Sequence, residues 1–375
     1  MRIKKEKNFI SMFDEKTGKY FRTGVIEGGK ETEMDPFMAS FPELLDIGIM
    51  GHCKHGRTGR CLAAGVECYQ DGLHSEEPNM KLEDFRRIAE ECEGKAFQFA
   101  LGGCGDPDQH ENFKEILEIC SKHKIVANFT SSGFGMNEDI AELCKTNCGA
   151  VAISWYRSEY TLRAIRLLLD AGVKTNIHYV LNRDTIQEAI ELLQKENFPK
   201  GINAVIFLLH KPVGLGSHEK MLTLGHEKPG EQLNGQSSGQ LNEQLNGQLE
   251  KFFRVIEEKN HPHKIGFDSC TVPGLINFCK EIDADSVDTC EGGRWSAYIT
   301  PDMKMLPCSF DNQEQRWAVD LRTHSIREAW NSNAFDSFRG SFLHACPDCK
   351  DRLACLGGCP IRPEVVLCNR SQRSR

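Results

Sequence analysis

The sequence lacks the features that mark several large classes of proteins. No run of about 18 apolar residues is present, so no segment is predicted to cross a membrane. The first residues, 1–7, are charged and have no apolar stretch behind them, which argues against a secretory signal. Basic residues are not in excess, because 46 Lys and Arg stand against 54 Asp and Glu, a formal net charge of -8. This balance argues against a nucleic acid as partner.

Cysteine, by contrast, is abundant, with 17 in a chain of 375 residues. The number is odd and no export signal is present, so a disulfide scaffold is not expected. We therefore expect a cytoplasmic protein whose thiolates are committed to metal.

The middle of the chain alternates between two hydrophobic periodicities. Strands are expected at 43–50, 97–101, 125–129, 150–154, 174–181 and 204–209, and helices at 82–92, 113–120, 137–145, 160–171 and 185–195. This alternation predicts an α/β fold with a parallel sheet and helices outside it. Six units are too few for the full eight-stranded barrel, so we expect an open, partial (βα)6 TIM-like barrel. Its ligands should lie at the carboxyl ends of the strands.

Shifts in composition suggest three regions. Residues 1–42 form an N-terminal extension with a predicted hairpin, 43–268 the barrel, and 269–375 a small cysteine-rich domain. Within the barrel, 217–250 is polar and partly repetitive, since Gln-Leu-Asn recurs there. We interpret this stretch as a surface insertion, disordered or loosely helical, without a catalytic role.

The first candidate site follows the first two predicted strands. Cys53, Cys61 and Cys68 come after the first strand, where a parallel barrel places its chemistry. Three thiolates would leave one cluster iron open, although a structural zinc with His52 or His55 as fourth ligand is an alternative. The second strand ends in a glycine-rich turn, 102–106, which allows close approach of a ligand. The carboxylate of Asp106 in this turn is suited to an ammonium group.

The second candidate site is a dense array of thiols near the end of the chain. It reads Cys346-x2-Cys349-x5-Cys355-x3-Cys359, with Cys368 after it and Cys290 and Cys308 before it. Thiolates at these spacings indicate zinc or an iron–sulfur cluster.

Together these features resemble the radical S-adenosylmethionine superfamily, in its branch with a C-terminal SPASM domain. The resemblance covers about 44–368 and is most specific in the array from Cys290 to Cys368. The chain departs from the family in its first motif, where Cys-x7-Cys-x6-Cys replaces the usual Cys-x3-Cys-x2-Cys. In addition, Asp106 stands in place of glutamate, Met303 in place of glycine, and Tyr69 follows the last cysteine instead of preceding it.

The resemblance implies a role for each of these positions. Cys53, Cys61 and Cys68 would hold a catalytic [4Fe-4S] cluster whose open iron chelates S-adenosyl-L-methionine. Contacts to this cofactor would come from Gly103, Cys104, Gly105 and Asp106 at the methionine amino group, Ser154 at the ribose and Tyr69 at the adenine. Two auxiliary clusters, making three [4Fe-4S] clusters in all, would be held by Cys270, Cys290, Cys308 and Cys359, and by Cys346, Cys349, Cys355 and Cys368. Cys279 is the alternative to Cys270.

The resemblance also implies an activity. The reduced cluster would cleave S-adenosylmethionine to methionine and a 5′-deoxyadenosyl radical, which takes a hydrogen atom from the substrate. We expect oxidative modification of a ribosomally synthesised peptide or protein, for example a thioether or carbon–carbon crosslink. The expected partners are this precursor and an electron donor such as flavodoxin or ferredoxin. Leader recognition would need either a separate leader-peptide-binding protein or an exposed sheet edge. The alternatives are a dehydrogenase of a small molecule or carbohydrate from the same superfamily, and a zinc-stabilised, non-catalytic binding protein.

Overall fold

The computed structural model describes residues 1–63, 65–224, 232–233, 236–282, 287–344, 346–349 and 351–368, with the backbone alone between 232 and 242. The chain forms two compact units. The first contains Met1–Val66, Gln70–Thr175 and Glu291–Arg339, and the second contains Glu67–Tyr69, Asn176–Cys290 and Gly340–Arg375. Each unit takes segments from both halves of the chain. The domain boundaries expected after 42 and 268 remain predictions.

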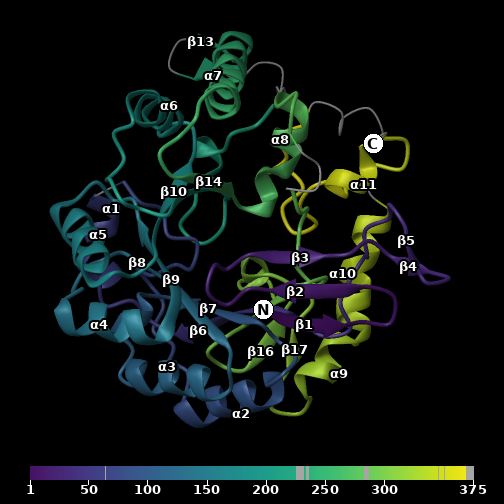
Figure 1. The fold of residues 1–375 in the computed structure, drawn as a ribbon. Coiled ribbons are helices and arrows are strands. Elements are labelled where there is room, and N and C mark those ends of the chain that lie inside the picture. Colours follow the sequence, from purple (N-terminus) through teal and green to yellow (C-terminus); the bar gives the residue numbers. More distant parts are fainter. Residues whose placement is uncertain are drawn as a thin grey trace. The chain divides into compact units, whose positions relative to one another are not determined.

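The first unit is built on parallel strands with helices on their outer face. Strands β6 (Leu44–Met50), β7 (Gln98–Gly103), β8 (Val126–Ser131) and β9 (Cys148–Ser154) pair in the order β9-β8-β7-β6. Figure 1 shows the covering helices α2 (Leu82–Cys92), α3 (Phe113–Lys122), α4 (Glu138–Asn147) and α5 (Glu159–Ala171). The predicted apolar positions of α2 are buried, and Asn137 caps α4. The first four expected strand–helix units are therefore confirmed.

The sheet of the first unit extends into the C-terminal part of the chain. Strand β15 (Ser296–Ile299) pairs in parallel with β6, and β16 (Lys304–Leu306) and β17 (Val319–Asp320) continue antiparallel beyond it. Helices α9 (Ile326–Trp330) and α10 (Asn333–His344) follow. Residues expected in a separate domain thus add strands directly to the edge of the barrel sheet.

The second unit continues the alternation of strands and helices. Strands β10 (Thr175–Leu181), β11 (Ala204–Leu209) and β14 (Lys264–Phe267) are parallel neighbours, and the helices are α6 (Ile186–Lys195), α7 (Ser238–Glu258), α8 (Val272–Phe278) and α11 (Arg352–Cys355). A two-residue pair, β12 (Gln232–Leu233) and β13 (Gln236–Ser237), precedes α7. The strands expected at 174–181 and 204–209 are confirmed.

The expected insertion at 217–250 needs a correction where it is described. Met221, Leu222 and Leu224 are buried, so the stretch up to 224 is packed and not a loose surface segment. From Ser238 the chain is helical, in α7, and the helix runs on to Glu258. Residues 225–231 and 234–235 of the expected insertion lie outside the described residues.

The N-terminal extension closes the end of the first unit that is remote from the expected chemistry. Strands β1 (Arg2–Lys5), β2 (Ile10–Phe13) and β3 (Tyr20–Arg22) form an antiparallel sheet, followed by the pair β4 (Ile26–Glu27) and β5 (Lys30–Glu31). The hairpin is confirmed, and β1 is an additional strand. Phe13 stacks on Phe97, just before β7, with ring centroids 5.4 Å apart. Because this is the amino end of the barrel strands, the contact serves stability.

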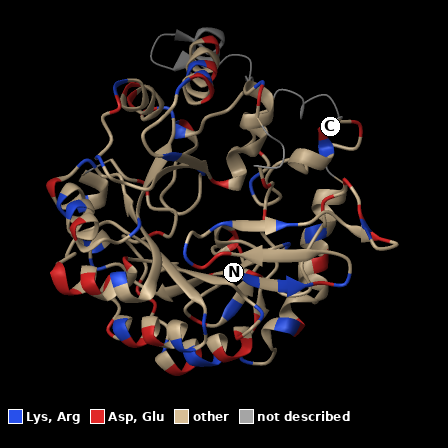
Figure 2. Ribbon diagram, in the orientation of Figure 1, with Lys and Arg blue, Asp and Glu red and all other residues tan. Residues whose placement is uncertain are grey.

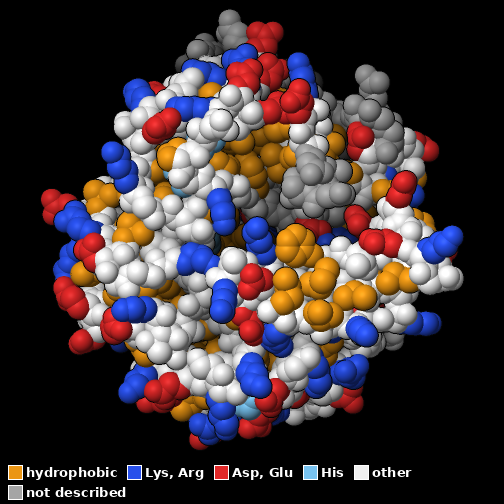
Figure 3. Space-filling model, in the orientation of Figure 1, with side chains coloured by type: hydrophobic (Ala, Val, Ile, Leu, Met, Phe, Trp, Pro, Cys, Tyr) orange, Lys and Arg blue, Asp and Glu red, His pale blue; other side chains and the backbone are white. Residues whose placement is uncertain are grey.

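The surface is mixed in character. Figure 3 shows apolar side chains gathered over the β1–β3 sheet, where Ile3 and Phe21 are exposed. Figure 2 shows acidic and basic residues interspersed along helices α2 to α5. Among the described residues, none belongs to a helix with the length and apolar character that crossing a membrane requires.

Candidate active site

The loop after β6, which carries Cys53 and Cys61, has secondary structure of its own. It contains a 3₁₀ turn at Gly56–Thr58 and helix α1 (Arg60–Ala63). The backbone N–H of Gly56 donates to the sulfur of Cys53 at 3.0 Å, a bond that favours a thiolate. Cys53 and Cys61 are both partly exposed, as a metal ligand must be before the metal enters. Both belong to the first unit, whereas Cys68 belongs to the second.

His55 anchors this loop by packing. Its ring is 5% exposed, stacks on Phe134 at 4.6 Å and meets the edge of Tyr160 at 5.6 Å. Its Nε2 lies 3.4 Å from the hydroxyl of Tyr160. Burial, and then the charge of Arg60, lower the pKa of His55, so the ring is neutral near pH 7. Between Cys53 and Cys61 the loop thus places an aromatic ring between α5 and the chain after β8.

The glycine turn after β7 lies directly against the cysteine loop. Gly103 and Gly105 have φ values of +105° and +134°, which favour glycine. A Cβ on Gly103 would lie 2.3 Å from the carbonyl oxygen of Met50. One on Gly105 would lie 2.8 Å from that of His52 and 3.3 Å from the Cα of Cys53. The close approach expected of this turn is therefore to the backbone that carries Cys53. Cys104, between the two glycines, is buried.

Asp106 ends the turn with its carboxylate already oriented. The backbone N–H of Ser132 donates to one oxygen at 2.7 Å and the Ser132 hydroxyl to the other at 2.5 Å. Burial raises the pKa of Asp106. Asp108, 7% exposed, has its pKa raised to about 6 by burial and by the charge of Asp106. The sequence analysis missed Ser132 and Asp108, although the polar run at the end of the third strand was a usable signal.

Tyr160 connects the turn with the cysteine loop. Burial and the charges of Cys61 and Asp106 raise the pKa of its hydroxyl, against a hydrogen bond from Ser158 that lowers it. The thiol, the carboxylate and this phenol are therefore electrostatic neighbours. Ser154, at the end of β9, is partly buried in the same unit.

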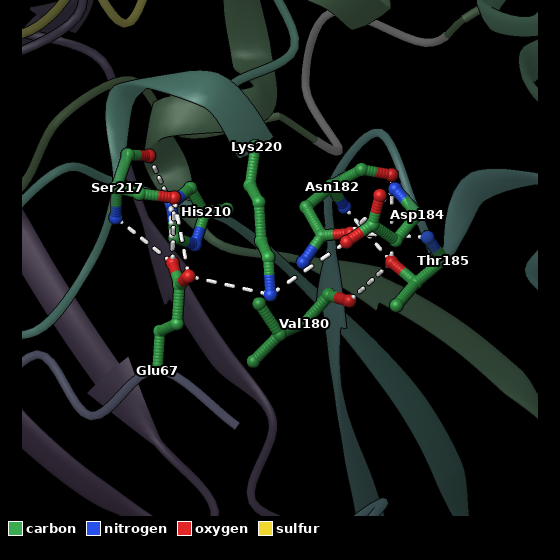
Figure 4. Close-up of polar contacts among 8 residues, drawn as sticks. All are labelled: Glu67, Val180, Asn182, Asp184, Thr185, His210, Ser217 and Lys220. Carbon is green, nitrogen blue, oxygen red and sulfur yellow. Dashed lines mark hydrogen bonds and ion pairs between the residues drawn. The ribbon is translucent and has the colours of Figure 1, made fainter. Parts of the chain in front are cut away.

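In the second unit, Glu67 fastens the segment that carries Cys68 and Tyr69. Figure 4 shows its carboxylate between Ser217 and Lys220. Oε2 of Glu67 accepts a hydrogen bond from the Ser217 N–H at 2.8 Å, and Oε1 lies 3.3 Å from the Lys220 ammonium. The same ammonium also lies 3.6 Å from the carboxylate of Asp184. Burial alone would raise the pKa of Glu67, but the contacts with Ser217 and Lys220 hold it below its usual range.

The loop after β11 also approaches this segment through its backbone. Leu215 N–H donates to the carbonyl oxygen of Cys68 at 2.9 Å. A Cβ on Gly214 would lie 2.6 Å from the same oxygen and 2.5 Å from that of Tyr69, whose side chain is 41% exposed. Residues 210–220 therefore hold the segment that carries Cys68, the last cysteine of the first motif, and we call them the clamp. The sequence analysis singled out only the end of this stretch, from 217, as the start of a polar insertion.

The C-terminal thiols of the second unit fall into two groups. Burial raises the pKa of Cys355, and the negative charges of Cys349, Cys368 and Cys346 add to this effect. Cys270 and Cys359 are in hydrogen-bonding contact, which is the largest cause of the raised pKa of Cys270. Cys279 belongs to neither group. Burial and the charge of Glu257 raise its pKa to about 11. Cys290 belongs to the second unit and Cys308 to the first.

These groups suit an iron–sulfur cluster. Thiols that raise one another's pKa become stable thiolates only with a cation among them, and a cluster core supplies it. Within the described part of the chain, no three His, Cys, Asp or Glu side chains are arranged to hold one metal ion. A four-iron cluster does not require that arrangement, because each of its cysteines binds a different iron.

Comparison with known proteins agrees with this chemistry. Residues 290–351 match the SPASM family, an iron-sulfur cluster-binding domain. SuiB from Streptococcus suis bound to S-adenosylmethionine superposes with a TM-score of 0.60 at 15% identity, over 90% of this chain and 78% of that chain. SuiB bound to precursor peptide SuiA gives 0.60 at 14%, over 90% and 77%. Native anSMEcpe with bound AdoMet and Cp18Cys peptide gives 0.59 at 17%, over 87% and 91%. No curated protein matches the chain.

The solved structures and the family match support different conclusions. At these identities the solved structures establish the fold, and the family match establishes the nature of residues 290–351. The prediction of an α/β, barrel-like fold followed by a SPASM domain is thereby confirmed. Residues 290–351 of the chain thus match the SPASM iron–sulfur cluster-binding domain, and the chain has the fold of SuiB and anSMEcpe.

Proposed function

We propose that this protein is a radical S-adenosylmethionine enzyme that oxidatively modifies a peptide or protein. The observation that carries the proposal is the close packing of the glycine turn on the cysteine loop, where a Cβ added to Gly105 would lie only 3.3 Å from the Cα of Cys53. A cofactor whose amino and carboxylate groups chelate a cluster iron would still have N–H bonds on that amino group, and a carboxylate beside the thiolates is suited to accept them. Asp106, one residue beyond Gly105, is suited to that role.

In this proposal Cys53, Cys61 and Cys68 hold the first cluster. When bound, that cluster supplies the electron that cleaves S-adenosylmethionine to methionine and the 5′-deoxyadenosyl radical. Asp106, oriented by Ser132, would accept a hydrogen bond from the amino group of the methionine moiety. Gly103 and Gly105 allow the turn bearing Cys104 to lie flat against the loop. Ser154 would contact the ribose, and Tyr69, fixed by the clamp, the adenine.

The remaining thiols are proposed as ligands of two auxiliary clusters. Cys346, Cys349, Cys355 and Cys368 would hold one, and Cys270, Cys290, Cys308 and Cys359 the other. The mutual influence of the first four, and the contact of Cys270 with Cys359, support this division. The position of Cys279 beside Glu257 favours Cys270 as ligand.

The peptide substrate is inferred from the relatives. SuiB has been crystallised with precursor peptide SuiA, and anSMEcpe with the Cp18Cys peptide. By analogy, the proposed partners are a precursor peptide or protein, a flavodoxin or ferredoxin as electron donor, and a separate leader-binding protein, all in the cytoplasm. The bond formed in the product is left to mass spectrometry of peptides incubated with the reduced enzyme and S-adenosylmethionine.

The first test is the amount of iron and acid-labile sulfide per chain after anaerobic reconstitution. We expect about 12 irons, because each [4Fe-4S] cluster contributes four. A variant with Cys53, Cys61 and Cys68 all changed to Ala should hold about 8 and release no 5′-deoxyadenosine. Cys279→Ala is the matched control and should retain all the iron. Parent protein with about 8 irons, or with zinc and no sulfide, would contradict the proposal.

A further inference from the structure

A pocket of about 440 Å³ lies within the second unit, along one edge of its sheet. Most of its lining is apolar and comes from α7, β14 and α8, and Val272 and Leu275 of α8 are buried there. Figure 3 shows apolar side chains gathered between α7 and α8. A concave apolar surface of this size is large enough to receive side chains of a bound molecule.

Strand β14 is the last strand of the sheet, and no strand in the described part of the chain pairs with its outer edge. The N–H of Lys264, at the start of β14, and that of Asp268, just after its end, donate to carbonyl oxygens on the β11 side at 3.1 and 3.0 Å. In a parallel ladder, successive residues point their N–H and C=O groups alternately to the two sides. The backbone groups of Ile265 and Phe267 therefore point to the outer edge. Both residues line the pocket and are partly exposed.

The exposed part of the pocket lining is acidic. It contains the carboxylates of Glu257 in α7 and of Glu281 and Asp288 after α8, and the described lining residues include no Lys or Arg. Glu257 is fixed in place, because its Oε1 accepts hydrogen bonds from the backbone N–H groups of Lys280 and Glu281, each at 2.7 Å. The pocket is thus suited to a ligand that has apolar groups and a positive charge.

The backbone edge and the acidic lining together favour one kind of occupant. Backbone groups at a free sheet edge pair readily with another extended segment, which an extended peptide supplies. A small amine would leave the outward backbone groups of Ile265 and Phe267 unused. A second copy of this chain would bring the same three carboxylates to the same edge, and like charges disfavour such pairing.

We propose that the outer edge of β14 binds an extended segment of the peptide or protein substrate as an added strand, with a basic side chain of that segment among Glu257, Glu281 and Asp288. The inference rests on the proposed function for the nature of the occupant, and deepens it by naming a place where the substrate is recognised. In this mode of binding the main-chain hydrogen bonds supply affinity and the pocket selects side chains.

The first test is fluorescence anisotropy of the full, reconstituted chain with a fluorescein-labelled probe peptide of alternating Val and Lys. We expect this probe to bind more tightly than a matched peptide of alternating Val and Glu. Methylation of its alternate backbone nitrogens should abolish binding, because the methyl groups block strand pairing. Hydrogen exchange in 264–267 should become slower when the unmethylated probe is bound.

The acidic lining is tested by the triple variant Glu257→Gln, Glu281→Gln and Asp288→Asn. It should bind the probe about 10-fold more weakly, because each exposed ion pair contributes modestly and three are lost together. The matched control changes three exposed carboxylates of the same unit that lie outside the pocket and should leave the affinity unchanged. These are Glu191→Gln, Glu250→Gln and Glu258→Gln.

The strand edge is tested by Ile265→Pro. Proline removes the outward N–H of this residue and is tolerated on an edge strand, so the pairing of β14 with β11 should persist while binding of the probe is lost. Where this variant does not accumulate, the methylated probe tests the same hydrogen bonds on the unchanged protein.

The outcomes separate this inference from the proposed function. Equal binding of the methylated and unmethylated probes, or equal affinity of the parent and the acidic triple variant, would overturn the inference alone. A parent chain that dimerises in sedimentation, and that Ile265→Pro makes monomeric, would instead assign the edge to a second copy. A parent chain that binds the probe but holds no iron and sulfide would overturn the proposed function, and with it the substrate as the occupant.

Discussion

At the scale of single residues, the carboxylate of Asp106 is already oriented before any ligand binds. Ser132 donates to both carboxylate oxygens, which fixes the rotamer without supplying a positive charge. Each oxygen keeps a lone pair for another donor. Burial raises the pKa of this carboxyl, and an N–H donor from a ligand would favour its charged form.

Asp106→Asn should therefore weaken binding of S-adenosylmethionine to the reconstituted protein by about 10- to 100-fold, because a charge-assisted hydrogen bond contributes about 1.5–3 kcal/mol. Ser132→Ala keeps the charge and loses only the orienting hydroxyl, so its loss should be smaller. Equilibrium dialysis under anaerobic conditions measures both. Equal affinities for Asp106→Asn and the parent would contradict a role for this carboxylate.

Glu67 should matter through Cys68, the residue that follows it. Glu67→Ala removes the contacts to Ser217 and Lys220, so the last cysteine of the first motif is held less firmly. We expect the iron retained after desalting to fall by up to about four per chain, the content of one cluster. Asp184→Ala is the control, because it removes a partner of Lys220 and leaves Glu67 on Ser217. Equal iron in the two variants would show that the clamp does not serve the cluster.

The sequence identified the thiols and the glycine turn, but not what holds them. Cys53 and Asp106 stand in recognisable motifs, so residue type and spacing were enough to propose them as site residues. Ser132 and Glu67 contact residues far away in the chain, and one sequence gives no measure of such distances. The choice between Cys270 and Cys279 likewise depended on which of them the fold brings to Cys359.

At the scale of elements, hydrophobic periodicity was sufficient for the barrel strands and helices, because each helix buries a regular apolar stripe. It was insufficient for β15, which has four residues, all buried, and so shows neither alternation nor length. Its pairing with β6 joins residues about 250 positions apart, which local sequence patterns do not encode.

Strand β6 offers a test by pH. Burial raises the pKa of Asp46, in that strand, to about 6. The folded state then binds this proton more tightly than the unfolded state does. Its stabilising contribution is complete below about pH 4, and is lost as the pH rises through about 6. Asp46→Asn should thus stabilise the protein at pH 7.5, by on the order of 2 kcal/mol, and much less at pH 4.5.

Thermal unfolding of the two proteins at both pH values measures this difference. Asp170→Asn, at an exposed position of α5, is the control and should change the melting temperature little at either pH. A stabilisation by Asp46→Asn that is the same at pH 4.5 and pH 7.5 would contradict the assignment of the proton to Asp46.

At the scale of the whole molecule, we expect the two compact units to depend differently on metal. The first is built on paired strands and packed helices, which need no metal to bury their apolar faces. In the second unit, residues 346–368 contain, where described, one short helix, α11, with thiols on both sides of it. Metal binding to such a segment contributes directly to its folding free energy.

Removal of iron with a chelator should therefore unfold residues 346–368 and leave β6, β7 and β8 folded. Hydrogen exchange read by mass spectrometry should show amide protection lower by about 100-fold or more in that segment, which corresponds to about 3 kcal/mol of lost binding free energy. Reconstitution with iron and sulfide should restore it, which controls for irreversible damage. Equal exchange in the two forms would mean that the segment folds by its own packing, and that the thiols of Cys346 to Cys368 are held in place before the cluster arrives.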